Sequence, residues 1–127
     1  MEPLLSIQLF DYLPYYRPGD ILKCDYQIDA VPREEILAVE ATVLWYTDGK
    51  GDEDMGVHFF ERRVAHDEDE TGDLRVLRSF STPLPESPLS YNGGIMQVHW
   101  CVRLRAFLPK GKEATLDHAF QLGNLVS

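Results

Sequence analysis

The chain has 127 residues, of which 44% are hydrophobic and 26% charged, and its formal net charge is −9 at pH 7. This length and composition predict one globular domain over residues 1–127 with its own core. The acidic balance argues against a nucleic-acid partner, because binding a phosphate backbone requires clustered Lys and Arg side chains. No apolar run approaches the ~20 residues of a membrane span, and residues 1–5 lack the pattern of a signal peptide. We therefore expect a cytoplasmic domain.

Alternation of apolar and polar residues with a period of two predicts strands along the whole chain. The first two expected strands cover residues 4–10 and 20–29. A third covers 36–47, and Asp48-Gly49 followed by Lys50-Gly51 predicts a hairpin turn after it, since glycine supplies the positive φ of tight turns. A fourth covers 55–62, and Gly56 near its start is expected to mark a bulge. The last three expected strands cover residues 74–81, 95–108 and 114–122.

Seven such strands, none with an internal proline, predict an all-β, immunoglobulin-like, two-sheet antiparallel β-sandwich. The proline-rich segment 82–88 is not expected to be regular structure. Large aromatic residues at inward positions are expected in the core: Trp45, Phe59, Phe80, Trp100 and Phe120. Tyrosines beside prolines are expected in loops, either as anchors for a partner or packed as rigid corners: Tyr12, Tyr15, Tyr16 and Tyr91.

The two cysteines flank Trp45 with the spacing of an immunoglobulin disulfide, but strand parity argues against that bond. Cys24 shares its parity with apolar residues, whereas Cys101 belongs to a polar row that alternates with Trp100. Because successive side chains on a strand point to opposite faces, the two thiols should lie on opposite sides of the inner surface. We expect both to be free, as in a reducing compartment.

The polar row of the sixth strand is the candidate partner-binding surface. It comprises His99, Cys101, Arg103 and Arg105, and it places two cations on an otherwise acidic domain. We expect His99, Arg103 and Arg105 to contact a protein partner. Sheet edges offer a second route to a partner or to a homo-oligomer, since their unpaired backbone groups allow β-augmentation.

The acidic stretch from Asp48 to Asp73 leaves an alternative open, a metal- or carbohydrate-binding sandwich module. Residues 67–72 copy the start of an EF-hand loop, but the twelfth position, where calcium requires a Glu, is Arg78. A looser calcium site could use four carboxylates from two loops: Asp52, Asp54, Asp67 and Asp69.

Signatures of catalysis and of cofactor binding are weak. The sequence has no Cys-x-x-Cys or His-x-x-x-His spacing, no Gly-x-Ser-x-Gly elbow and no phosphate-binding loop of the Gly-x-x-x-x-Gly-Lys kind. We therefore expect neither an enzyme nor a bound cofactor.

Two segments resemble arrestin domains. The opening Tyr16-Arg17-Pro18-Gly19-Asp20-x-Leu22 is similar to the family's entry into its second strand. The passage from Phe80 to Val102, with Thr82-Pro83-Leu84-Pro85 and Pro88-Leu89-Ser90-Tyr91-Asn92-Gly93, resembles the family's proline-rich crossing into a long strand. The resemblance implies an arrestin-like sandwich, shared with bacterial sporulation-control proteins, that acts as an adaptor, scaffold or trafficking partner. Typical arrestins carry two such domains in tandem, and this chain has room for one.

Overall fold

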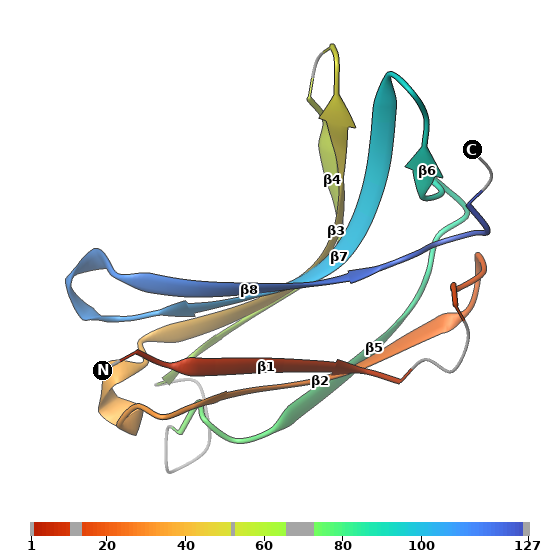
Figure 1. Cartoon of the computed structure of the whole chain (residues 1–127). Coiled ribbons are helices and arrows are strands. Elements are labelled where there is room, and N and C mark those ends of the chain that lie inside the picture. Colours follow the sequence, from red (N-terminus) through yellow and green to blue (C-terminus); the bar gives the residue numbers. More distant parts are fainter. Residues whose placement is uncertain (1, 11–13, 52, 66–72, 126–127) are drawn as a thin grey trace.

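The strands of this protein form two antiparallel sheets, as the computed structural model in Figure 1 shows. It describes residues 2–10, 14–51, 53–65 and 73–125. Within these ranges there are eight β-strands and two short 3₁₀-helices, and no α-helix. The predicted all-β, two-sheet sandwich is confirmed.

The smaller sheet has three strands in the order β1-β2-β5. These are β1 (Leu4–Leu9), β2 (Ile21–Asp29) and β5 (Arg78–Pro83). Along β2 the even-numbered side chains are buried and the odd-numbered ones are more exposed, as expected for a strand with one face on the core.

The larger sheet has five strands in the order β4-β3-β7-β6, with β8 also paired to β7. Their bounds are β3 (Ala38–Gly49), β4 (Met55–Val64), β6 (Tyr91–Asn92), β7 (Met96–Phe107) and β8 (Glu113–Phe120). One 3₁₀-helix precedes β3 at Arg33–Glu35, and the other joins β7 to β8 at Pro109–Gly111. In Figure 1, β3, β4 and β7 bend together, and their far ends rise away from the three-stranded sheet.

The core lies between the two sheets. Fully buried side chains from both sheets fill it, among them Leu22, Ile28, Val43, Trp100 and Leu104. Burying each such side chain stabilises the fold by about 1.5–3 kcal/mol. The prediction that five large aromatics face inward is confirmed, since all five belong to this core or pack against it. Tyr16 is also buried, with its ring 5.6 Å from that of Phe120, so it is a packed corner and not an exposed anchor.

Most predicted strand limits differ from the observed ones by one or two residues, and the start of the fifth strand differs by four. β3 continues through Gly49, because that residue still pairs with Met96 of β7, so Asp48-Gly49, the first half of the predicted turn, belongs to the strand. The fifth strand begins at Arg78 and ends at Pro83, not at 74–81. Proline is tolerated there because β5 is an edge strand, where a missing N–H is not needed. The eighth strand, which the sequence did not predict, is the two-residue β6.

The predicted bulge exists, but at His58 and not at Gly56. Val43 pairs with Phe59 and the next residue, Leu44, pairs with Val57, so His58 is the extra residue of β4. Its Nε2 donates a hydrogen bond of 2.7 Å to the carbonyl oxygen of Pro83, which lies in the other sheet. A bulge bends the strand that contains it, which agrees with the bend of β4 in Figure 1.

Candidate interaction surface

The face of the five-stranded sheet that points away from the three-stranded sheet is called the outer face below. It lies on the inside of the bend in Figure 1. The antiparallel register places His99 beside Tyr46, Cys101 beside Leu44 and Arg103 beside Thr42 on this face. The structure therefore brings the predicted row of β7 together on one face, as strand alternation requires.

Cys101 departs from the prediction that the whole row is open to a partner. Its residue is only 3% exposed, and Leu44 beside it is 2% exposed, although both belong to the outer face. Burial, and then the charge of Asp117, raises the pKa of Cys101 to about 11. Cys101 therefore acts as a small apolar residue beneath this surface.

Both arginines of the row are held in ion pairs across strands. Arg103 makes two parallel hydrogen bonds to Asp117 of β8, at 2.8 and 3.1 Å. These bonds are the main cause of the raised pKa of the Arg103 guanidinium. Arg105 Nη2 lies 2.9 Å from a carboxylate oxygen of Glu113, also on β8, and Arg105 Nη1 lies 3.6 Å from Glu40 of β3.

The ion pairs continue to β4, at the edge of the sheet. Arg62 lies 2.5 Å from Glu40, so this carboxylate is shared between Arg62 and Arg105. Both guanidinium groups also lie over the ring of Phe107, at 5.2 and 4.9 Å. Cations and carboxylates thus alternate across the sheet, and the row presents oriented side chains instead of a net positive patch.

His99 lies at the other end of the row. Its ring is 5.0 Å from that of Tyr46, and its Nε2 lies 3.9 Å from Asp48. The side chain of His99 is 42% exposed, so a partner could reach it. The roles predicted for His99, Arg103 and Arg105 remain predictions.

An exposed group of apolar side chains on β4 was missed by the sequence analysis. Met55, Val57 and Phe60, called the apolar strip below, are 53%, 57% and 53% exposed. Through the register they lie beside Tyr46, Leu44 and Thr42, all on the outer face. Strict alternation would separate Val57 from Phe60. The bulge at His58 restores them to one face, and no sequence signal had placed it there.

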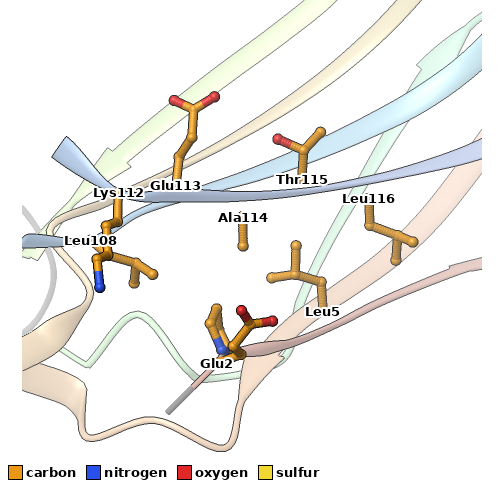
Figure 2. Close-up of a pocket in the computed structure, with 9 residues that line it drawn as sticks. Glu2, Leu5, Leu108, Lys112, Glu113, Ala114, Thr115 and Leu116 are labelled. Atoms are coloured by element: carbon orange, nitrogen blue, oxygen red, sulfur yellow. The ribbon is translucent and has the colours of Figure 1, made fainter.

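A lateral cavity of about 720 Å³ lies between β1 and β8, where the edges of the two sheets face each other. Figure 2 shows Leu5 projecting from β1 toward Ala114 and Leu116 of β8, with charged side chains at the rim. No histidine or cysteine lines this cavity in the described ranges. Leu5, Leu108, Ala114 and Leu116 share its lining with the charged side chains Glu2, Lys112 and Glu113.

The alternative calcium site falls mostly outside the described residues, which exclude Asp52, Asp67 and Asp69. Asp54 is described, and its Oδ1 accepts a hydrogen bond of 2.9 Å from the backbone N–H of Met55. Over residues 2–10, 14–51, 53–65 and 73–125, no three His, Cys, Asp or Glu side chains are grouped to hold a metal ion.

The predicted pair of free thiols is confirmed, since Cys24 and Cys101 form no disulfide. Cys24 belongs to the core cluster, whereas Cys101 lies on the outer face, as parity predicted. In the described part of the chain, no helix has the length and apolar character needed to cross a membrane.

Comparison with known proteins supports the fold. No protein-family model and no curated protein matches the sequence. Among solved structures, the chain is similar to Spo0M, a sporulation control protein from Bacillus subtilis, with a TM-score of 0.58 and 12% sequence identity. The two chains share a fold. The match covers 96% of this chain and 49% of the Spo0M chain, so this chain spans about half of that protein's length. It supports the arrestin-like sandwich that the sequence motifs implied.

Proposed function

We propose that this chain is a non-enzymatic interaction domain of the adaptor or scaffold kind, resembling one half of an arrestin, that binds a protein partner. The observation that carries the proposal is the outer face of the five-stranded sheet. The inner faces of both sheets are filled by the core, whereas the outer face carries oriented polar side chains beside an exposed apolar strip. Interfaces combine these two kinds of surface, an apolar centre and a polar rim.

The ordered charges of the outer face suit recognition of a partner better than chemistry. Arg103 is fixed by a bidentate pair with Asp117, and Arg105 by carboxylates on two strands. Paired charges at the rim of an interface give specificity and orientation more than affinity. A partner would therefore gain its binding free energy from apolar contacts and its specificity from His99, Arg103 and Arg105.

A cytoplasmic, regulatory setting agrees with two further features. The buried cysteines are unpaired, which is typical of a reducing compartment. The similar fold of Spo0M, whose name is sporulation control protein, favours a regulatory role over a metabolic one.

Affinity capture followed by direct binding tests the proposal. The wild-type chain and an Arg103→Glu/Arg105→Glu variant are used as baits in native extract, and each retained protein is then purified and titrated against both baits. We expect saturable binding to the wild type and at least tenfold weaker binding to the variant. Equal binding to both baits would remove the row from the interface, and no saturable partner for either bait would contradict the adaptor function.

A further inference from the structure

The long edge of the five-stranded sheet is β4. It pairs with β3 from Met55 to Val64, and it is the outermost strand of that sheet. Among the described residues, no backbone hydrogen bond joins the second edge of β4 to another strand. An edge of this length offers unpaired N–H and C=O groups to another strand.

The side chains along β4 change character from one end to the other. Glu53 and Asp54 immediately precede the strand, the apolar strip occupies its first half and centre, and Arg62 follows near its end. Arg62 has a side chain 47% exposed, and Glu53 is exposed. An antiparallel partner strand therefore needs a cation at one end, an apolar centre and a carboxylate at the other end.

The β4 strand of a second copy meets these requirements. When two copies of β4 are laid antiparallel about a twofold axis between His58 and Phe59, Val57 lies opposite Phe60 of the second copy. In the same register Arg62 lies opposite Met55 of the second copy, with Glu53 of that copy as its diagonal neighbour. Opposed Cβ atoms in such pairs are about 5 Å apart and diagonal ones about 7–8 Å, within reach of long side chains.

The bulge makes this register possible. A twofold axis perpendicular to a sheet keeps each outer face on the same side, so opposed residues must share a face. Val57 and Phe60 differ in parity, and they share the outer face only because His58 is inserted between them. Apolar contacts and opposite charges both occur twice, as isologous association requires.

We propose that this protein forms a homodimer through β4, in which the two five-stranded sheets join into one continuous sheet. This goes beyond the proposed function, because it does not depend on a heterologous partner. The dimer brings the apolar strips of the two copies together on one outer face and leaves the rows of His99, Arg103 and Arg105 on the same side of the joined sheet.

Complementary charge variants test the proposal by analytical ultracentrifugation over a concentration series. We expect the wild type to sediment with twice the mass of the 14.5 kDa chain. Arg62→Glu brings two carboxylates together at both ends of the interface, because the new side chain neighbours Glu53 of the second copy. Glu53→Arg brings two guanidinium groups together at the same places. Each variant alone should raise the dissociation constant by roughly tenfold or more.

Mixing the two charge variants is the decisive measurement. In a heterodimer of Arg62→Glu with Glu53→Arg, the two substituted side chains meet at one end as an ion pair of reversed polarity. The original Arg62 and Glu53 meet at the other end. An equimolar mixture should therefore associate more tightly than either variant alone, and sedimentation of the mixture at the mass of two chains measures this recovery.

Two further variants separate dimerisation from folding. Phe60→Ser removes the central apolar contact and leaves the ion pair between Arg62 and Glu40 in place. It should weaken the dimer while the circular dichroism spectrum is unchanged. Leu4→Ser, at a side chain 65% exposed on the edge strand β1, is the matched control and should leave the dimer intact. A wild type that stays monomeric at sub-millimolar concentration would overturn the proposal. So would dimeric single variants, or folded variants whose mixture stays monomeric.

Discussion

The phenolic oxygen of Tyr26 donates a hydrogen bond of 2.9 Å to Oε2 of Glu61 and thereby connects the two sheets. Tyr26 belongs to β2 of the three-stranded sheet, and Glu61 belongs to β4 of the five-stranded sheet. Arg63 Nη1 lies 3.4 Å from the same phenolic oxygen. Burial is the main cause that raises the pKa of Tyr26 to about 12. The phenol therefore stays protonated and donates at neutral pH.

Removing this hydroxyl should weaken the fold. Tyr26→Phe leaves the Glu61 carboxylate without its donor on β2, and we expect the free energy of unfolding to fall by about 1–3 kcal/mol. Urea denaturation followed by circular dichroism measures the change. Tyr91→Phe, at a tyrosine 48% exposed, is the matched control and should leave the midpoint unchanged. Equal midpoints for Tyr26→Phe and the wild type would show that the bond contributes nothing net.

Gly56 should not tolerate a side chain. The Trp45 ring lies against this glycine across the strand pair, at the position that a Cβ atom would occupy. Gly56→Ala must displace the indole, and we expect it to destabilise the fold by about 1–3 kcal/mol, as overpacking does. Gly94→Ala is the control, since nothing lies within 4 Å of its added Cβ. Thermal denaturation of both variants should show a lower midpoint for Gly56→Ala alone.

The two thiols should react slowly in the folded protein. Burial is the main cause that raises the pKa of Cys24 to about 12 and that of Cys101 to about 11, from an ordinary value of 9.0. The thiolate is the reactive form, so at pH 8 its population should fall roughly a thousandfold at Cys24 and a hundredfold at Cys101. Reaction with a chromogenic disulfide should be slow in buffer and fast in denaturant. Rapid native reaction of either thiol would contradict its burial.

The same shifts predict that alkaline pH destabilises the fold. A group whose pKa is higher in the folded state than in the unfolded state favours folding below its unfolded value, and this contribution is lost as pH rises toward the folded value. For Cys24 the loss should run from about pH 9 to about pH 12. The free energy of unfolding, measured by urea denaturation between pH 8 and pH 10, should decline, and Cys24→Ala should decline less steeply.

The carboxyl of Asp73 should titrate well below its ordinary range. Arg75 makes two side-chain bonds of 3.0 Å to this carboxylate, and Arg75 N–H donates a third of 2.9 Å. These bonds lower the pKa of Asp73 to about 2. The lower folded-state pKa makes the pair stabilising above pH 4, and the effect is lost as pH falls toward 2. Carbon-detected NMR titration should show this, and Arg75→Gln should return the midpoint toward 3.8.

Local alternation was sufficient to predict most of the architecture. The faces of β7, the opposite placement of the two cysteines and the inward aromatics all follow from a period of two, and the structure agrees. The burial of Cys101 could not be predicted this way, because parity assigns a side chain to a face and does not say how deeply its neighbours bury it there. The apolar strip was missed for a similar reason, since one inserted residue changes which side chains share a face.

Because His58 is an extra residue in β4, the strand cannot lose one residue without changing which side chains face the core. Deleting His58 would rotate the preceding residues by half a turn, sending Met55 and Val57 toward the core and Gly56 toward solvent. Trp45 would then lose the glycine against which it packs. In a relative with the same strands, a one-residue alignment gap at His58 would turn the core-facing side chains before it toward solvent and the solvent-facing ones toward the core. Such a deletion would be more disruptive than most single substitutions.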